Sequence, residues 1–358
     1  SMYLYGVLLL NGDGVEIDKK EAAKYFKNSS EKGNINSMYY YATMLLSGET
    51  IPKDKEKALY YLKLSADNGN IDSMFKYGKI LFDDKTFSNK EESVYYLKKS
   101  AEKGNADAML QYGIMLLNGN FINMNKQEAA KYLKNSADLG NDEAMFIYGC
   151  MVFKGEDIKV NKKEGVRYIR MSAKKGNPKA LNSYGNLYYN GYGILLDYEG
   201  FPVNKTKAAK YFKKAAMKGN HDAMTSYGEM LLQGIGIPVN KKKAAKYFKM
   251  AANKGNEKAS YYYGTMFFDG YIIQRNITEA AYYFKKSSDL GNKDSLFKYY
   301  LILLLQNKIN KTEALKEFKF LADEGNDDAM IFYSLILKDG NEEDEKEAVH
   351  YLKMAIDK

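Results

Sequence analysis

Nine Gly-Asn pairs lie at nearly constant spacing along this chain. The successive intervals are 36, 35, 36, 36, 43, 36, 36 and 34 residues. Such a period is typical of stacked structural repeats. It constrains the fold more than the length of 358 residues, which alone would favour two or three globular domains. The turns are Gly33-Asn34, Gly69-Asn70, Gly104-Asn105, Gly140-Asn141, Gly176-Asn177, Gly219-Asn220, Gly255-Asn256, Gly291-Asn292 and Gly325-Asn326.

The stretch Lys207–Asn240 shows the repeating unit most clearly. Its KAAKYFKKAA segment places apolar residues at helical spacing and lysines on the opposite side. Gly219 suits the left-handed residue that ends a helix, and Asn220 suits the cap of the next one. Gly228 leaves room for close approach of a partner helix. Helices of about a dozen residues are marginal alone, so the pattern predicts hairpins that stabilise one another by stacking.

The other helix of each hairpin begins at its own Asp or Asn, and Glu stands three residues after seven of these ten positions, close to a capping box. Together the signals predict an all-α protein, an α/α solenoid of about ten antiparallel helix hairpins that occupies residues 1–358 as a single domain. We expect a seven-residue insertion near 195–201. We also expect a solenoid incomplete at both ends, because Ser1 falls part-way into a repeat. The start positions are Asp18, Asp54, Asn89, Asn125, Asn161, Asn204, Asn240, Asn276, Asn310 and Asp344.

The repeated pattern, small-x-x-x-x-Gly followed by Gly-x-Gly and then Asp/Asn-Lys-x-x-Ala-x-x-Tyr-Phe-x-x-Ala-Ala-x-x-Gly-Asn, resembles the Sel-one-like repeats, relatives of tetratricopeptide repeats. The resemblance covers essentially the whole chain. It implies a right-handed superhelix whose first helices line a concave face, and scaffold or adaptor roles. This chain departs from the family by placing tyrosine, where leucine is usual, before the close-packing glycine. We interpret these tyrosines as core residues: Tyr5, Tyr41, Tyr77, Tyr112, Tyr148, Tyr184, Tyr227, Tyr263, Tyr299 and Tyr333.

The first helix of each repeat also carries a variable stripe at its fourth, seventh and eleventh positions, counted from its small residue. Residue types change along the stripe as a peptide-binding groove would require, and Asn and Gln can both donate to and accept from an extended backbone. A plain solvent-exposed surface would show the same variety, so both interpretations stay open. The candidate residues are Lys76, Lys79, Gln111, Asn118, Ser183, Asn186, Asn190, Ser226, Glu229, Gln233, Tyr262, Thr265 and Asp269.

Two irregular places are candidate contact sites. The insertion after Gly191 is apolar, and it either forms a binding loop or covers its own hairpin. In repeat nine Tyr300 replaces the close-packing glycine, and apolar residues enter the stripe there and in repeat ten. That second patch would be a homodimer contact, a partner site or a surface covered by further C-terminal residues. The loop residues are Leu195, Leu196, Tyr198 and Phe201, and the patch residues are Leu301, Leu305, Phe332 and Leu335.

The composition argues against catalysis and against cofactor or metal binding. The two histidines, His221 and His350, are far apart along the repeats, and Cys150 has no base nearby in the pattern. A single cysteine excludes an intramolecular disulfide and suits a reducing compartment. We therefore expect a cytoplasmic protein, with the secretory lumen still open because the N-terminus appears truncated. No segment is long and apolar enough to span a membrane.

The net charge of +9 permits an acidic partner without requiring one. Most lysines recur on the outward side of the KAAKYFK helix, which favours a solvated face, and the stripe contains acids, which argues against RNA in the groove. We predict a non-catalytic scaffold that binds a protein or peptide, as a segment or a partner helix, in its concave groove. The alternatives are an array that self-associates through repeats nine and ten and, less favoured, an RNA-binding helical repeat.

Overall fold

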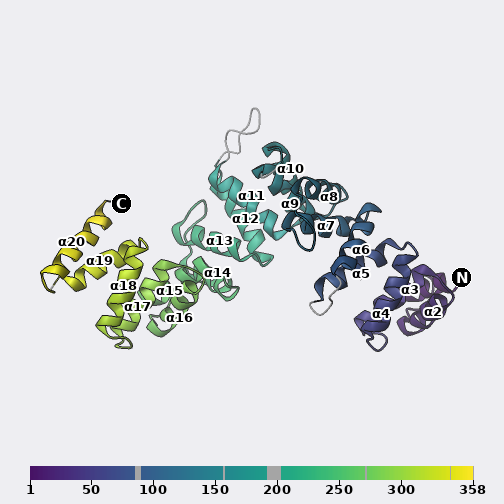
Figure 1. Cartoon of the computed structure of the whole chain (residues 1–358), viewed down its shortest axis with the longest axis horizontal. Coiled ribbons are helices and arrows are strands. Elements are labelled where there is room, and N and C mark those ends of the chain that lie inside the picture. Colours follow the sequence, from purple (N-terminus) through teal and green to yellow (C-terminus); the bar gives the residue numbers. More distant parts are fainter. Residues whose placement is uncertain (85–89, 156–157, 192–202, 271, 339, 358) are drawn as a thin grey trace. The chain divides into compact units, whose positions relative to one another are not determined.

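The computed structural model describes residues 1–84, 90–155, 158–191, 203–270, 272–338 and 340–357, and these form twenty α-helices and no β-strand (Figure 1). The predicted all-α class and the ten hairpins are confirmed. The chain divides into two compact units, Ser1–Asn177 and Pro178–Lys358. A single solenoid over 1–358 and its right-handed superhelix stay predictions.

The first unit consists of five consecutive hairpins, each pairing an odd-numbered helix with the even-numbered helix that follows it. Neighbouring hairpins pack through contacts of each even-numbered helix with the next odd-numbered one. The helices are α1 (Met2–Asn11), α2 (Lys19–Glu31), α3 (Ile35–Ser47), α4 (Lys55–Asp67), α5 (Ile71–Asp83), α6 (Lys90–Glu102), α7 (Ala106–Asn118), α8 (Lys126–Asp138), α9 (Asp142–Lys154) and α10 (Lys162–Lys175).

The second unit repeats the same arrangement. Its helices are α11 (Pro178–Asn190), α12 (Lys205–Met217), α13 (His221–Gln233), α14 (Lys241–Asn253), α15 (Glu257–Asp269), α16 (Ile277–Ser288), α17 (Lys293–Leu305), α18 (Lys311–Asp323), α19 (Asp327–Leu337) and α20 (Glu342–Ile356). In both units the core lies between paired helices and is made mainly of Ala, Phe, Leu, Met and Tyr side chains.

Each Gly-Asn turn ends one helix and begins the next, as predicted. The nine glycines have φ between +79° and +104°, the left-handed region that glycine enters without steric cost. At Gly33 an added Cβ would meet no atom within 4 Å, so the backbone conformation alone requires glycine there. The following asparagine caps the next helix; Asn34, for example, accepts from the Ser37 amide at 2.8 Å.

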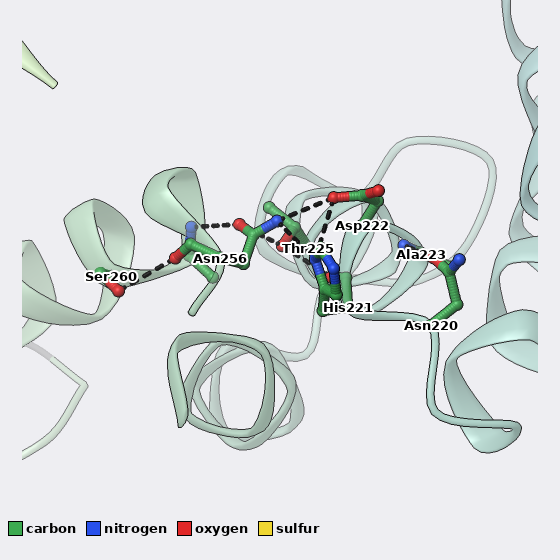
Figure 2. A network of polar contacts seen from close by, with 8 residues as sticks. Asn220, His221, Asp222, Ala223, Thr225, Asn256 and Ser260 are labelled. Atoms are coloured by element: carbon green, nitrogen blue, oxygen red, sulfur yellow. Dashed lines mark hydrogen bonds and ion pairs between the residues drawn. The ribbon is translucent and has the colours of Figure 1, made fainter. Parts of the chain in front are cut away.

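The asparagine also joins neighbouring repeats, which the sequence pattern did not indicate. The Oδ1 of Asn256 accepts from the Ala259 amide at 2.9 Å. Its Nδ2 donates to Asp222 of the preceding repeat, also at 2.9 Å (Figure 2). The Thr225 hydroxyl donates to the same Oδ1 at 2.9 Å. Equivalent bonds between repeats link Asn70 to Asn36, Asn105 to Asp72, Asn141 to Asp107, Asn177 to Asp142, Asn292 to Glu257 and Asn326 to Asp294.

Close packing in seven of the ten hairpins involves a glycine in the odd-numbered helix. A Cβ on Gly228 would lie 2.8 Å from Phe248 of α14, and one on Gly113 would lie 2.8 Å from Leu133 of α8. The prediction that Gly228 allows close approach of its partner is therefore confirmed.

The tyrosine before this glycine lies in the core of most repeats. Eight of the ten are between 4 and 9% exposed, whereas Tyr5 is 41% exposed and Tyr299 is partly buried. In nine hairpins this ring meets a tyrosine of the even-numbered helix edge-on, with centroids 4.7–5.3 Å apart, a favoured aromatic geometry. The pairs are Tyr5–Tyr25, Tyr41–Tyr61, Tyr77–Tyr96, Tyr112–Tyr132, Tyr148–Tyr168, Tyr184–Tyr211, Tyr227–Tyr247, Tyr263–Tyr283 and Tyr333–Tyr351.

The glutamate at the start of the even-numbered helices differs from its expected role. Among the described helices the reciprocal capping box forms only in α18, with Asn310, and in α20. The α20 cap is Asn341, three residues before the predicted Asp344, because that aspartate serves as the reciprocating acid. Elsewhere the glutamate binds other side chains; Glu164, for example, accepts from Tyr148 at 3.0 Å.

Repeat nine is the irregular hairpin that the sequence indicated. Tyr300 of α17 stands where seven odd-numbered helices have glycine and where α3 and α19 have the small residues Ala42 and Ser334. Glu317 of α18 stands where the other repeats have the paired tyrosine. The two helices make fewer close backbone contacts than any other hairpin in the described parts of the chain. This hairpin lacks both the small residue of the odd-numbered helix and the tyrosine of the even-numbered helix. The Tyr300 side chain lies between α17 and α18 and keeps the two helices further apart than in the other hairpins.

Candidate partner-binding surface

The variable stripe of the second unit lies on α11, α13 and α15. Some of its predicted residues are exposed and the others are partly buried. The surface therefore consists of exposed polar side chains next to partly buried ones. The exposed residues are Asn186, Asn190, Gln233 and Asp269, and the partly buried ones are Ser183, Ser226, Glu229, Tyr262 and Thr265.

Two of these residues meet across neighbouring repeats. Glu229 of α13 forms a 2.8 Å ion pair with Lys258 of α15, and the Lys258 ammonium lies 5.8 Å from the centroid of the Tyr262 ring. Tyr262 in turn stacks on the buried Phe248, with centroids 4.8 Å apart. A carboxylate, an ammonium and an aromatic ring are therefore held together on one surface by two adjacent repeats.

The electrostatics of this cluster follow from partial burial. Burial raises the pKa of the Tyr262 hydroxyl, and the Glu229 carboxylate raises it further, so this phenol remains a hydrogen-bond donor at neutral pH. Burial lowers the pKa of Lys258, but the hydrogen bond and charge of Glu229 outweigh it, and the net shift is upward. Tyr189 of α11 also acts electrostatically on both groups. The cluster can therefore hold a polar peptide group against aromatic surface.

The stripe of the first unit lies on α5 and α7 and differs in character. Lys76 is partly buried, with its ammonium 5.4 Å from the centroid of the Tyr39 ring, and desolvation lowers its pKa. Lys79 is exposed and lies 5.8 Å from the Phe75 ring centroid. Gln111 of α7 is partly buried, and Asn118, at the last position of that helix, is exposed.

Of the other two candidate sites, only the apolar patch lies within the described residues. The predicted binding loop, with Leu195, Leu196, Tyr198 and Phe201, lies outside the described residues. The apolar patch of repeats nine and ten is smaller than expected, because Leu301 and Phe332 are partly buried against the core of α17–α20. Leu305 and Leu335 remain 67% and 56% exposed.

The residues considered for catalysis do not come together. His221 binds its neighbour Asp222, and His350 packs against the Tyr351 ring. Burial raises the pKa of the Cys150 thiol to about 11, which keeps it protonated and unreactive at neutral pH. Within the described ranges, no group of three or more His, Cys, Asp or Glu side chains could hold a metal ion. In the same ranges, no helix has the length and apolar character to cross a bilayer.

These features place the chain in a known class of helical-repeat proteins. The Sel1 repeat model matches residues 1–34, 35–70, 71–105, 106–141, 142–177, 178–220, 221–256, 257–292 and 327–358. The chain therefore belongs to the Sel1 repeat family, as the sequence resemblance predicted. The unmatched interval, 293–326, is the irregular repeat nine. Sel1 repeat proteins generally serve as scaffolds for protein–protein interaction and are typically non-catalytic.

Solved structures show the same fold. One is a protective antigen present in uropathogenic Escherichia coli strains, displaying an SLR fold; it has a TM-score of 0.79 and 21% identity, over 99% of this chain and 75% of that chain. Another is a Sel1 repeat protein from Oxalobacter formigenes, with a TM-score of 0.63 and 21% identity, over 82% of this chain and 84% of that chain. Comparison with curated proteins gave no match.

Sequence reasoning missed Lys258, Tyr189 and Tyr39, which complete these surfaces. They lie outside the fourth, seventh and eleventh positions from which the stripe was drawn. A signal was available: Lys258 stands at the second position of α15, four residues before Tyr262, a spacing that brings two side chains onto one helix face.

Proposed function

We propose that this protein is a non-catalytic interaction scaffold, and that the surface formed by α11, α13 and α15 binds an extended segment or a helix of a partner protein. The observation that supports this most is the Glu229–Lys258–Tyr262 cluster, in which two repeats hold a partly buried carboxylate and a partly buried ring beside an exposed ammonium. Aromatic rings with adjacent hydrogen-bonding groups are typical of protein interfaces.

The exposed amides supply the polar part of recognition in this proposal. Asn186, Asn190 and Gln233 each carry both a donor and an acceptor, which is what an extended backbone requires on each side. Asp269 at the end of α15 adds a negative charge beside them. No nucleic acid, cofactor or metal takes part in this function, and we expect it in the cytoplasm.

The test replaces Asn186, Glu229 and Gln233 together by Ala. A partner is first isolated with the whole chain as bait, and its affinity for both forms is then measured by titration calorimetry. Each buried hydrogen bond that is lost costs about 1–3 kcal/mol when its counterpart stays unpaired, so we expect the triple variant to bind more than about tenfold more weakly.

A matched control replaces three exposed residues away from this surface, Asn253, Thr278 and Glu345, by Ala. We expect it to bind as the unmodified chain does, with both variants keeping the helical circular dichroism spectrum. Equal affinity of the triple variant and the control would remove this surface from the proposal.

Self-association is the second candidate, supported by the exposure of Leu305 and Leu335 on the face of α17 and α19. Two leucines of this kind, next to the 43% exposed Ile331, would be buried by a second copy. Replacing Leu305 and Leu335 by Ser should then lower the mass measured by light scattering from dimer to monomer. A monomeric unmodified chain over the whole concentration range would rule this candidate out.

A further inference from the structure

Two neighbouring even-numbered helices, α12 and α14, carry lysines and no acidic residue at all. Lysines follow Phe212 and Phe248 and recur along the outer side of both helices. Lys205 is partly buried and donates to the Tyr189 carbonyl, while the others are exposed, and the structure pairs none of them with a carboxylate of the described residues. These exposed lysines are Lys207, Lys210, Lys213, Lys214, Lys218, Lys241, Lys242, Lys243, Lys246, Lys249 and Lys254.

The charge of the whole chain is concentrated here. Residues 203–255 contain twelve lysines and only two acids, Asp222 and Glu229, both on α13. The net charge of the chain is +9, so the remaining residues hold one more acid than base. The positive net charge of the protein therefore comes from residues 203–255, and the rest of the chain is nearly neutral. The lysines of α12 and α14 form a strongly positive surface.

Three other repeats show what these lysine positions can bind. In each of the three, the lysine after the buried core residue of an even-numbered helix pairs with a glutamate in the next even-numbered helix. The pairs are Lys63–Glu92 at 2.5 Å, Lys134–Glu164 at 3.4 Å and Lys319–Glu347 at 2.6 Å. The lysine equivalent to these on α12 is Lys213, and the glutamate position on α14 is occupied by Lys243. The corresponding position at the start of α12 is also a lysine, Lys207.

The two helices lie next to each other, so their charges form one surface. At their N-terminal ends, the Thr206 hydroxyl donates to the Gly236 carbonyl at 3.0 Å, just before α14 begins. At their C-terminal ends, the Lys254 ammonium lies 3.8 Å from where a Cβ on Gly219 would stand. At the equivalent positions of three other repeats, charged groups of successive even-numbered helices lie 2.5–3.4 Å apart, so like charges on α12 and α14 are near enough to repel one another. Repulsion between these lysines does not stabilise the fold, so we look to binding for the role of this surface.

We propose that the lysine surface of α12 and α14 binds an acidic segment of a partner protein, whose carboxylates occupy the positions that glutamates fill in other repeats. The chain itself shows that carboxylates fit these lysines. The surface is on the even-numbered helices, so it is separate from the surface of α11, α13 and α15, and either can fail without the other.

Two other anionic partners fit less well. Single-stranded nucleic acid is bound through aromatic stacking and arginine, but the tyrosines of both helices, Tyr211 and Tyr247, are partly buried in tyrosine pairs, and neither helix contains arginine. Membrane binding needs several apolar side chains on the same face. Within α12 and α14 only Met217 and Met250 are large, apolar and exposed.

The experiment measures binding of a fluorescent peptide of about twelve residues, alternating glutamate and serine, matched in length to one of these helices. The variant Lys207→Glu/Lys243→Glu introduces at both positions the glutamate that seven other repeats of this chain have. The control Lys131→Glu/Lys163→Glu makes the same change in charge on α8 and α10. A glutamine–serine peptide, an RNA duplex and phosphatidylserine vesicles are titrated in parallel.

We expect the unmodified chain to bind the acidic peptide with an affinity that falls with salt. The α12/α14 variant should bind about tenfold or more weakly, the control within about twofold, and Lys207→Arg/Lys243→Arg as the unmodified chain does. Thermal melts should show that the glutamate variant is at least as stable as the unmodified chain. The proposal fails if both charge-reversal variants lose affinity equally, if the acidic peptide does not bind, or if the duplex or the vesicles bind more tightly at this same surface.

Discussion

Asn141 shows how much one side chain contributes to a junction between repeats. Its Oδ1 accepts from the Ala144 amide and its Nδ2 donates to Asp107, both at 2.9 Å. Aspartate or serine would also cap the helix. Unlike an ionised aspartate, the amide also carries a donor, so it can cap the helix and at the same time donate to a carboxylate in the preceding repeat. This accounts for asparagine at the seven turns where a bond to a side chain of the preceding repeat forms.

Replacing Asn141 by Asp should therefore destabilise the protein although the cap is kept. The donor is lost, and two carboxylates come within hydrogen-bond distance. We expect the free energy of unfolding in urea to fall by about 1–3 kcal/mol at pH 7. The loss should shrink at acid pH, where one carboxyl is protonated and can donate.

The matched control is Asn240→Asp. Asn240 caps α14 through a 2.9 Å bond from the Lys243 amide, and its Nδ2 makes no bond to another of the described residues. A negative charge at a helix N-terminus is favourable, so this variant should be as stable as the unmodified chain or slightly more so. Equal destabilisation by both substitutions would show that the bond between repeats contributes nothing.

Cys150 provides a second test at the scale of one residue. Burial raises the pKa of its thiol from 9.0 to about 11. Since only the thiolate reacts, alkylation by iodoacetamide at pH 8 should be about a hundredfold slower than for an unburied thiol of ordinary pKa. The unfolded chain in guanidinium is the control and should react at the ordinary rate. Equally fast reaction of the native protein would contradict the burial of this thiol.

At the scale of the hairpin, glycine and tyrosine determine how closely two helices approach. A Cβ on Gly113 would lie 2.8 Å from Leu133 Cγ and 3.4 Å from the Ala129 carbonyl. Repeat nine shows the consequence of losing this residue, because Tyr300 at the equivalent position goes with a looser hairpin. The same interval has no match to the family model.

Alanine is usually more stable than glycine inside a helix, but we expect the replacement of Gly113 by Ala to destabilise this protein. In an unconstrained helix this change stabilises by about 0.5–1 kcal/mol, but here the methyl group overpacks the interface and should cost about 1–3 kcal/mol. Urea unfolding of Gly113→Ala, Leu133→Ala and the double variant checks the cause. The double variant should lose less than the sum of the single changes, because the smaller side chain makes room. Simple additivity would show that α7 and α8 are not limited by this contact.

At the scale of the whole molecule, the buried tyrosine pairs should make the free energy of unfolding fall as the pH rises above 10. The pKa values of Tyr112 and of Tyr168 are raised to about 12, mainly by burial and, for Tyr168, also by its hydrogen bond to Asp138. The unfolded value is 10, so both states bind the proton below pH 10. Between pH 10 and 12 the unfolded chain loses the proton that the folded chain keeps, and the free energy of unfolding falls.

We therefore expect Tm to be insensitive to pH just below 10 and to fall steeply above it. Circular dichroism melts between pH 8 and 11.5 measure the effect. Tyrosinate absorbance near 295 nm should appear together with unfolding for the buried rings, whereas the chain in guanidinium should titrate near pH 10. A native chain that ionises its buried tyrosines near pH 10 without losing helicity would contradict this account.

Much of the fold was predictable because each repeat contains its own local signals. Gly-Asn turns, helical spacing and caps act within a few residues, so they are visible in the sequence, and repetition confirms each one several times. Contacts between repeats were less visible. The bond from Asn256 to Asp222 joins residues 34 apart, and the ion pair of Glu229 with Lys258 depends on how adjacent helices are packed.

The sequence by itself determined that short, individually marginal helices stack as hairpins, because a period of about 36 residues with a glycine at each turn permits little else. Tertiary structure decided which polar residues meet: the Glu229–Lys258–Tyr262 cluster, the partial burial of Leu301 and Phe332, and the lysines of α12 beside those of α14. The physical reason is the distance along the chain between the residues that interact. Backbone conformation is set by neighbours in the chain, whereas charge pairing and burial depend on residues that packing brings together.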